Sequence, residues 1–534
     1  MTPADPPGDP GPGRPHRTLW HHTGRGLHGL ALLGAWAGLA VLAGLTLFLG
    51  SSRELTLASH DAVVRPTLDR HVVVRTGPVL PDLRLDSGSR IGVEIELGKT
   101  DVASVKVLGD RYARIAANPE GQVAAVRRTL EDMARVAAVR GAALAVLPLL
   151  LWVALGRRRR RELVRALPRR EGVASLAALA LVAAIVGAPW IRGSAPARPV
   201  EQWQSLSAFL GDDIAIPPEA DDVEVLSTGV TGQTRRLVGS IVSSYRRGQE
   251  FYLQAAEDAA GLDLREPAED ETVVLVVSDR HDNIGMDRVA RAIGDAGGAS
   301  AVYDAGDDTS TGEPWEAFSL DSLDAAFDDL DQRYAVAGNH DNGTFVRDYL
   351  SDLGWTYPGG EVIDGPGDSR LLGTDDPRAS GLGDWRDESG LSFSEVEERL
   401  ADAACAADAD GDRPSTVLVH DANMASTALD RGCVDLVIGG HTHVEQGPTR
   451  VVGEDGRVGY TYTVGTTGGA AYAVAVGSKL RRAAGVALIT YRDGRPVGVQ
   501  GVTLQTNGRY DVRAYVPLDY AEEAGAGRAV DART

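Results

Sequence analysis

The sequence predicts an α/β protein, namely a two-sheet α/β sandwich preceded by an α-helical membrane region. Two observations predict this fold class. From residue 271 onward, short apolar runs alternate with segments of helical period, as they do in an α/β domain. Ahead of them lie three apolar stretches, each long enough to cross a bilayer. Because 534 residues exceed one ordinary hydrophobic core, we expect several domains.

The first apolar stretch, residues 27–49, is almost free of charge and follows a tail at residues 1–26. At about 1.5 Å per residue, a helix of this length crosses a hydrocarbon core of roughly 30 Å. We interpret it as a retained membrane span, with a cleaved signal peptide and a buried helix as the alternatives. Gly34 and Gly38 form a small-xxx-small pair that could mediate association of helices.

Two further spans are predicted at residues 136–155 and 173–191. The second span contains Arg140 and Pro148, both of which membrane helices tolerate. Between the two spans, residues 156–172 form a basic loop, and the positive-inside rule predicts that this loop is cytoplasmic. The N-terminal tail is then cytoplasmic too, and everything after the third span lies outside.

Residues 50–135 would form a small extracytoplasmic domain. Apolar and polar residues alternate at 91–97, which predicts a half-buried strand. Residues 102–117 and 121–134 have the pattern of helices. No chemical motif occurs in this region, so we expect a structural or sensing role.

Residues 192–270 are interpreted as a linker followed by a helix at 234–260, and residues 271–534 as the α/β domain. The strands of this domain are predicted at residues 273–277, 301–303, 334–337, 416–419 and 436–438. Its helices are predicted at residues 286–293, 320–330, 343–353 and 393–405. Later runs at 458–464 and 486–491 lack long intervening helices and predict a second, more antiparallel sheet.

Five short motifs of metal-ligand residues follow the predicted strands. In chain order they are Asp279-Arg280-His281, Gly306-Asp307-Asp308, Gly338-Asn339-His340-Asp341, His420, and Gly440-His441-Thr442-His443. A single His or Asp is more often a structural residue than a ligand, but five motifs in series are hard to explain in that way. Because loops leave the carboxyl ends of the strands at one edge of a sheet, these side chains are expected to converge there.

This series resembles the motifs of the calcineurin-like metallophosphoesterases over residues 271–444, which carry D-x-H, G-D, G-N-H-D/E, an isolated His and G-H-x-H in the same order. The resemblance implies a sandwich of metallophosphoesterase type with two metal ions. One ion would be held by Asp279, His281, Asp307 and His443. The other would be held by Asp307, Asn339, His420 and His441, with Asp307 bridging the two ions.

The resemblance also implies a mechanism of phosphate-ester hydrolysis. Imidazole and carboxylate ligands suit Mn, Fe, Zn or Co, and a shared carboxylate brings two cations to about 3.5–4 Å. A water between them would become a hydroxide and attack phosphorus. His340 would stabilise or protonate the leaving oxygen, and Asp341 would orient His340.

Some nearby residues receive weaker assignments. Asp282, Asn283 and Asp308 are interpreted as turn residues or as support for the ligands, and residues 466–469 as a tight turn between strands. The purple acid phosphatase branch has a Tyr three residues after the Asp of its G-D motif, whereas this chain has Ser310 there. A tyrosinate-bound ferric iron is therefore not supported, and the identity of the metal stays open.

The composition adds two constraints. The chain has 54 Lys and Arg against 75 Asp and Glu, a formal net charge of -21, which argues against nucleic acid as the main partner. Cys405 and Cys433 are too few for a thiolate zinc cluster. They lie near the predicted sheet edge opposite the metals, where a disulfide formed in an oxidising exterior and two buried free thiols are both open.

The expected function is that of a multi-pass protein of the cell membrane whose extracytoplasmic domain is a phosphatase or phosphodiesterase. Its substrate would be a phosphomonoester or phosphodiester, such as a nucleotide, a cyclic nucleotide or a lipid phosphate. The alternative is a non-catalytic envelope protein that binds a phosphorylated ligand through the metal domain. That alternative predicts a missing ligand or a missing His340, and none is missing. A nuclease would need a basic groove, whereas residues 321–331 are acidic.

Overall fold

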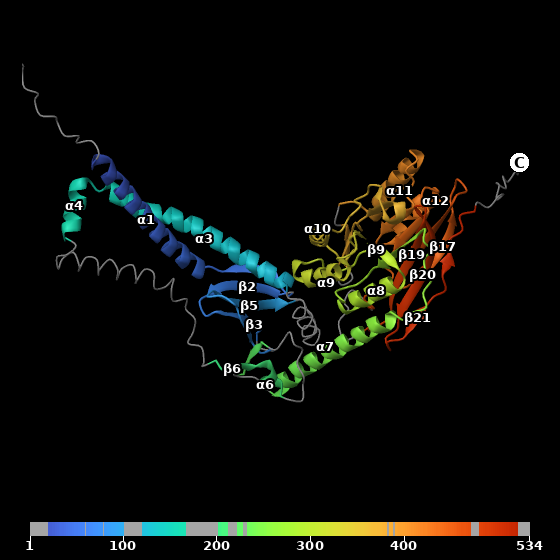
Figure 1. Cartoon of the computed structure of the whole chain (residues 1–534), viewed down its shortest axis with the longest axis horizontal. Coiled ribbons are helices and arrows are strands. Elements are labelled where there is room, and N and C mark those ends of the chain that lie inside the picture. The colour runs from blue at the N-terminus through green and yellow to red at the C-terminus, as the bar shows by residue number, and fades with distance from the viewer. Residues whose placement is uncertain are drawn as a thin grey trace, which may run out of the picture.

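The computed structural model of the chain has three parts: a pair of long helices, a small sheet and a larger α/β domain (Figure 1). The residues that it describes are 20–58, 60–77, 80–100, 120–166, 201–211, 222–227, 232–381, 384–387, 390–470 and 480–521.

The two long helices, α1 (Trp20–Leu49) and α3 (Glu120–Ala154), lie side by side and extend away from the small sheet (Figure 1). Phe48 packs near Met133, whereas the Trp36 Nε1–H donates to the carbonyl of Ala142 at 3.1 Å, so the helices are antiparallel. Each contains a stretch that is long and apolar enough to cross a membrane, and only 11% and 17% of these stretches is buried. Their apolar faces are therefore exposed, unlike those of a core helix in a soluble protein.

Two glycines allow the close approach of this helix hairpin. A Cβ at Gly141 would lie 2.5 Å from the amide nitrogen of Gly44 and 2.8 Å from the carbonyl oxygen of Ala40. At Gly34 and Gly38, the pair that the sequence singled out, a Cβ would meet nothing within 4 Å. Gly44 and Gly141 thus lie where the two helices touch, and association with another copy through Gly34 and Gly38 stays a prediction.

The structure changes several predicted boundaries in this region. The helix expected at 121–134 and the span expected at 136–155 form one continuous helix, α3, which continues through Pro148 to Ala154. The basic residues after it form a short helix, α4 (Arg157–Ala166), at the far end of the hairpin (Figure 1). The predicted helix at 102–117 and the predicted span at 173–191 lie outside the described residues.

The small sheet has seven strands in the order β1-β2-β5-β3-β4-β7-β6. Its strands are β1 (Arg53–Leu57), β2 (His60–Thr67), β3 (His71–Arg75), β4 (Leu83–Asp86), β5 (Gly92–Thr100), β6 (Trp203–Ser205) and β7 (Glu224–Leu226). In β5 the side chains of Val93 and Ile95 are buried, which confirms the predicted half-buried strand. The last two strands come from the predicted linker, which is therefore part of the sheet, because β7 pairs antiparallel with β4.

The small sheet is joined to the larger domain by α7 (Gly232–Ala259), which confirms the helix predicted at 234–260. A short helix, α6 (Leu206–Leu210), packs with the first turns of α7, and the last turns of α7 lie in the core of the larger domain. The end of α3 near the sheet also contacts the larger domain at η2 (Pro314–Glu316) and α9 (Ala317–Phe327).

The larger domain contains two stacked sheets, as predicted. In the first sheet the order is β10-β9-β8-β19-β20-β21, with β22 also paired to β20. Its strands are β8 (Glu271–Val277), β9 (Ala299–Asp304), β10 (Gln332–Ala335), β19 (Ala484–Arg492), β20 (Arg495–Leu504), β21 (Tyr510–Val512) and β22 (Val516–Pro517). The second has the order β11-β12-β15-β16-β18-β17. Its strands are β11 (Ile363–Asp364), β12 (Arg370–Thr374), β15 (Thr416–Val419), β16 (Leu436–Gly439), β17 (Gln446–Val452) and β18 (Val458–Thr463).

Apolar side chains that alternate along the strands fill the space between the two sheets. Val274 and Val276 of the first sheet share a buried core with Leu418 and Ile438 of the second. The outer faces are covered by helices, with α7, α8 (Gly285–Ala296), α9 and α10 (Phe345–Asp352) on the first sheet. On the second sheet, α11 (Phe393–Ala409) and α12 (Ser426–Asp430) provide the cover.

One prediction about the sheets was wrong. The late runs at 458–464 and 486–491 were expected to form a second sheet together, but they lie in different sheets. β18 continues the second sheet parallel to β16, and β19 pairs antiparallel with β8 in the first sheet. The run at 486–491 is largely apolar on both faces, whereas in the run at 458–464 Val and Tyr alternate with Gly and Thr. Neither pattern identifies the partner strand.

Cys405 and Cys433 form a disulfide, which decides between the two alternatives left open by the sequence. The bond joins the last turns of α11 to the segment between α12 and β16. Both residues belong to the core under the outer face of the second sheet.

Replacing both cysteines by serine should destabilise the larger domain by about 3–4 kcal/mol, because the bond closes a long loop in the unfolded chain. The two cysteines are 28 residues apart. Urea unfolding followed by tryptophan fluorescence would measure the change. Equal midpoints for the wild type and for the Cys405→Ser, Cys433→Ser variant would contradict the stabilising role.

Gly141→Val should separate the helix hairpin, because even a Cβ at this position overlaps the backbone of α1. Overpacking of this kind costs about 1–3 kcal/mol. The midpoint of thermal denaturation in detergent, followed by circular dichroism, should fall for this variant. Gly38→Val is the matched control, since a Cβ there meets nothing, and it should keep the wild-type midpoint.

Candidate metal centre

The five motifs lie at one edge of the sandwich. Asp279, Asp307 and Asn339 follow the neighbouring parallel strands β8, β9 and β10 of the first sheet. His420 and His441 follow the parallel strands β15 and β16 of the second sheet. The carboxyl ends of both sheets thus bring together residues that are far apart in sequence, as predicted.

The backbone is strained at these residues. Asp279, His281, Asp307, His441 and His443 have φ values of 52°, 45°, 59°, 68° and 58°, in the left-handed region that side chains other than Gly rarely adopt. Strain of this kind costs on the order of 1–3 kcal/mol per residue and is typical of functional sites. Its concentration in the predicted ligands supports a functional role for the edge.

Close packing of the loops requires glycine at two motif positions. A Cβ at Gly306 would lie 2.4 Å from the amide nitrogen of Gly338, and a Cβ at Gly338 would lie 2.2 Å from Asp307 Oδ1. The glycines of the G-D and G-N-H-D motifs therefore let the two loops touch beside the carboxylate of Asp307.

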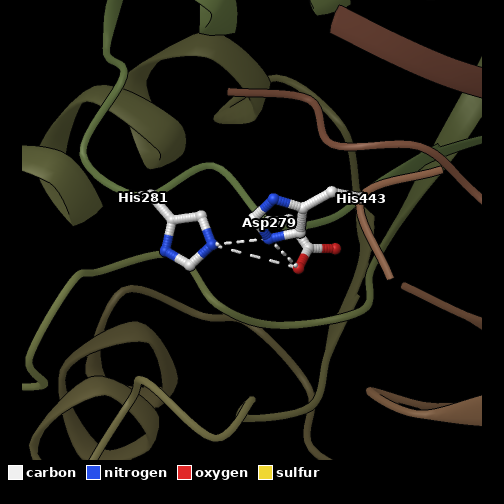
Figure 2. Close-up of side chains that lie close together, drawn as sticks. All are labelled: Asp279, His281 and His443. Carbon is white, nitrogen blue, oxygen red and sulfur yellow. Dashed lines mark hydrogen bonds and ion pairs between the residues drawn. The ribbon is translucent and has the colours of Figure 1, made fainter. Parts of the chain in front are cut away.

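Asp279, His281 and His443 form the first group of candidate ligands (Figure 2). The Nε2 atoms of the two histidines are 3.1 Å apart, and Asp279 Oδ1 lies 3.1 Å from His443 Nε2 and 4.0 Å from His281 Nε2. Oδ2 of Asp279 accepts hydrogen bonds from the Ser278 hydroxyl and the His441 N–H, whereas its buried Oδ1 accepts none from the described residues. Two imidazole nitrogens and one unpaired carboxylate oxygen at one point form a donor set that fits a divalent cation.

Asp307 and His420 form the second group together with Asp279. His420 Nε2 lies 3.2 Å from Asp307 Oδ2 and is buried without a hydrogen bond to the described residues. His281 Nε2 is 3.7 Å from the same carboxylate oxygen, so Asp307 lies between the two groups, as expected of a bridging ligand. Asp279, however, is the residue that the two groups share, which the motifs alone did not indicate.

Asn339 and His441 are the other two predicted ligands. Asn339 Oδ1 is buried and has no hydrogen-bond partner among the described residues. The ring of His441 lies beside that of His420, with centroids 5.2 Å apart, and its Nε2 is 3.9 Å from Asp421 Oδ2. His441 thus lies next to the group that it was predicted to complete, and the buried Oδ1 of Asn339, which has no partner among the described residues, is available as a ligand atom.

The candidate ligands are strongly coupled electrostatically. Although burial by itself would lower both values, the pKa of His420 is raised well above its usual value by Asp307, and the pKa of His443 is raised by Asp279. Burial by itself would raise the pKa of Asp307, but the imidazoles of His420, His340 and His281 outweigh it and hold the pKa well below its usual value. The pKa of Asp279 is lowered in the same way against burial, by His443 and His420. Burial lowers the pKa of His281 to about 4, so this imidazole is neutral at neutral pH and has a lone pair to donate.

His340 lies at the rim of the centre. Its Nδ1 is 3.2 Å from the carbonyl oxygen of Ser310, and its ring centroid is 5.2 Å from that of His281. Its backbone N–H donates to Asp307 Oδ1 at 2.7 Å. The carbonyl of Ser310, and not the carboxylate of Asp341, therefore orients the imidazole.

Asp341 has a different role from the predicted one. Its Oδ2 accepts from the backbone N–H groups of Asp307 at 2.7 Å and Gly338 at 3.0 Å, and its Oδ1 accepts from the N–H and hydroxyl of Thr309. Burial and the carboxylates of Asp308 and Asp307 raise its pKa to about 8. Asp341 thus ties the loop that carries Asp307 to the loop that carries Asn339.

Arg280 is a supporting residue that the sequence interpretation missed. Its fully buried guanidinium donates to Asp308 at 2.9 Å, to both carboxylate oxygens of Asp287 at 2.8 Å and to the carbonyl of Ser319. It links the Asp279–His281 loop to α8 and α9, and Asp308 is its partner, consistent with the supporting role predicted for Asp308. The sequence did contain a signal for this role. Arg280 lies between two predicted ligands, and a guanidinium buried there needs buried carboxylates as partners.

Residues 466–469 also support the centre. The Thr466 hydroxyl and the Gly468 N–H both donate to the carbonyl of Asp279, at 2.8 and 3.1 Å. The Asn283 side-chain amide donates to the carbonyl of Gly468. The carbonyl of Ala470, the residue after this segment, accepts from His443 Nδ1 at 3.1 Å. The predicted turn is present, and it holds the backbone of the first ligand group and the orientation of one imidazole.

Comparison with known proteins agrees with the motifs. Residues 272–445 match the family model of the calcineurin-like phosphoesterases, almost the range over which the resemblance was predicted. No curated protein matches the sequence significantly.

Three solved structures are similar to parts of the chain. The sulfate thiohydrolase SoxB of Thermus thermophilus, in complex with glycerol, is 20% identical over 45% of this chain and 43% of its own, with a TM-score of 0.28. An archaeal phosphodiesterase is 14% identical over 46% of this chain and 100% of its own, with a TM-score of 0.25. The Thermus thermophilus protein TT1561 is 12% identical over 45% of this chain and 98% of its own, with a TM-score of 0.29. The chain spans less than half of SoxB, and these scores are too low for any conclusion about function.

Asp307→Asn should lower the amount of tightly bound manganese from two equivalents, because the carboxylate between His281 and His420 loses its charge. Mass spectrometric metal analysis after gel filtration would measure it. Asp352→Asn, at an exposed position on α10, is the matched control and should bind as the wild type does. If Asp307→Asn still bound two equivalents of manganese, Asp307 would not be a metal ligand.

Proposed function

We propose that residues 272–445, which match the family model of the calcineurin-like phosphoesterases, form a phosphoesterase domain, and that the protein is a membrane-anchored, binuclear-metal hydrolase of phosphomonoesters or phosphodiesters. The observation that carries the proposal is the convergence of the donor atoms of Asp279, His281 and His443 beside those of Asp307 and His420. Buried carboxylates and imidazoles in this number have no structural purpose that would justify their desolvation.

The ligands of the two ions are proposed to be those expected from the motifs. One ion takes Asp279, His281, Asp307 and His443, and the other takes Asp307, Asn339, His420 and His441. When bound, two such cations lower the pKa of a water that becomes the nucleophile and neutralise charge on the phosphoryl oxygens. The low pKa values of Asp279 and Asp307 suit this role, because these carboxylates stay ionised at neutral pH.

His340 is the proposed proton donor to the leaving oxygen. The Ser310 carbonyl holds its Nδ1, which leaves Nε2 as the nitrogen available for substrate. The partly exposed position of His340 beside the buried His281 gives a phosphate ester access to both the imidazole and the metal ligands. Asp341 contributes indirectly, because it holds the two loops from which Asp307 and His340 project.

We propose that the helix hairpin spans a membrane. The exposed apolar faces of α1 and α3 would face lipid, and the arginines of α4 at the far end would lie in the cytoplasm. The small sheet and the larger domain then lie outside, which agrees with the disulfide between Cys405 and Cys433.

Strand pairing supports a third crossing. From the small sheet the chain runs along α3 to α4, at the far end of the hairpin. The strands that follow α4 in the sequence, β6 and β7, belong to the small sheet again. If the hairpin spans a membrane, the chain between α4 and β6 has to cross it again. The apolar stretch at 173–191 is the segment of the sequence suited to that crossing.

Hydrolysis by the full chain in detergent tests the proposal. Manganese-dependent turnover is expected against a panel of aryl phosphomonoesters, aryl phosphodiesters, nucleotides, cyclic nucleotides and lipid phosphates. Asp307→Asn should abolish it, and His340→Ala should lower kcat by about 100-fold or more, as expected for loss of a proton donor. Asp352→Asn should keep the wild-type rate.

The outcomes separate the enzyme from the alternative. Turnover lost in both variants supports the hydrolase and begins to define the leaving group. Two equivalents of bound metal without hydrolysis of any ester would instead favour a protein that binds a phosphorylated ligand. A net charge of -21 makes a nucleic acid an unsuitable substrate, so the panel contains none.

A further inference from the structure

The two helices that leave the small sheet each reach a loop of the metal centre. On α7, the Tyr252 hydroxyl accepts a hydrogen bond at 2.9 Å from Asn283, two residues after His281. On α3, the buried amide of Gln122 donates to the carbonyl of Trp315, in the segment that follows Asp307. The second contact joins a predicted membrane helix to the catalytic domain.

Gln122 also bonds to the small sheet. Its Oε1 accepts from the N–H of Ala58, in the turn between β1 and β2, at 3.3 Å. Around this polar bridge, Ala58 packs against Trp315 and Phe318, which are 3% and 1% exposed. A buried amide that loses its partners is destabilising, so the bridge defines how the end of α3 docks on the domain.

The segment that Gln122 contacts is held together by one carboxylate. The buried Glu316 accepts from the backbone N–H groups of Ser310 at 3.0 Å, Thr311 at 3.1 Å and Glu313 at 2.9 Å, and from the Thr311 hydroxyl at 2.6 Å. With this many bonds to a single side chain, residues 310–316 are expected to move as one body.

The other end of this segment contacts the reacting groups. Ser310 accepts from His340 Nδ1 through its carbonyl and donates from its hydroxyl to Asp282 at 2.6 Å. A shift of Trp315 relative to the sheet therefore shifts the carbonyl that orients His340. From Gln122 to His340 the connection passes through the Trp315 carbonyl, the Glu316 cluster and the Ser310 carbonyl in turn.

We propose that Gln122 is a positioning residue for the proton donor, which couples the end of α3 beside the small sheet to the orientation of His340. The inference rests on the proposed function for its chemical step. In that step the water oxygen bonds to phosphorus as the bond to the leaving oxygen breaks. His340 gives the proton from Nε2 to the leaving oxygen, and the proton released by the water restores His340. α3 is continuous from Gln122 to Ala154, so a change in its tilt would be transmitted to the site.

The experiment uses the full chain in detergent and two esters that differ in their need for a proton donor. An ester of 4-nitrophenol has a leaving group that departs as an anion, whereas an ester of an aliphatic alcohol does not. For Gln122→Ala, kcat with the aliphatic ester should fall about tenfold. This is less than the loss expected from removing the proton donor itself, because His340 is still present but less well oriented. With the nitrophenyl ester it should fall less than about twofold, and KM and bound metal should stay unchanged.

Two further variants sharpen the test. Gln122→Glu keeps an acceptor for the Ala58 N–H but faces the Trp315 carbonyl with a carboxylate, so it should be at least as impaired as Gln122→Ala. Gln254→Ala removes an exposed glutamine of α7 that bonds within its own helix to Asp258, and it should match the wild type. In a His340→Ala background, Gln122→Ala should have no additional effect on kcat if the two residues act through one another.

Hydrogen exchange provides a readout that does not depend on hydrolysis. The amides of Ser310, Thr311 and Glu313 should exchange faster in both Gln122 variants than in Gln254→Ala. If the wild type cleaves no ester, the proposed function fails, and the exchange rates alone then decide the coupling. Unchanged exchange, an equal loss of kcat with both esters, or an additive effect with His340→Ala would each overturn the inference.

Discussion

The burial of two carboxylates side by side is the constraint on which the rest of this structure depends. Asp279 and Asp307 are both fully buried and contribute to the same group of candidate ligands. Anions of this kind cost several kcal/mol each in desolvation and repel one another unless positive charge is close by. The imidazoles of His420 and His443 lie 3.2 and 3.1 Å from these carboxylates, and the cations proposed here would supply positive charge. The strained backbone of the ligands shows the cost at which the geometry is kept.

The architecture of the larger domain provides the rigidity that this strain requires. Parallel strands from both sheets end at one edge, and the core between the sheets is closely packed with valine, leucine and isoleucine. Behind the ligands, Arg280, Asp341 and Thr466 tie the loops to one another and to α8 and α9. Each of these side chains bonds to the backbone or carboxylate of a loop that carries a ligand, so the ligands are placed by several independent contacts.

The small sheet connects the helix hairpin to the catalytic domain. It is built from segments on both sides of α3 and α4 in the sequence, and α7 carries it to the core of the larger domain. Because α3 also touches η2, the position of the hairpin is defined by two contacts and not by one flexible connection. A domain attached in this way has a defined orientation relative to the helix hairpin.

The sequence by itself determined the strands and helices around the motifs, the order of the ligand motifs and two of the apolar helices. These features depend on local periodicity and on residue chemistry, which can be recognised in short stretches of the sequence. It did not determine that β6 and β7 complete the small sheet, that β18 and β19 belong to different sheets, or that Gly44 and Gly141 form the helix contact. It also assigned Asp341 to His340, whereas the Ser310 carbonyl fills that place. Only the tertiary structure decides such pairings. Strand pairing, close contacts at glycine and hydrogen bonds to a backbone carbonyl involve main-chain atoms, which are the same in every residue, so the sequence does not identify the partner.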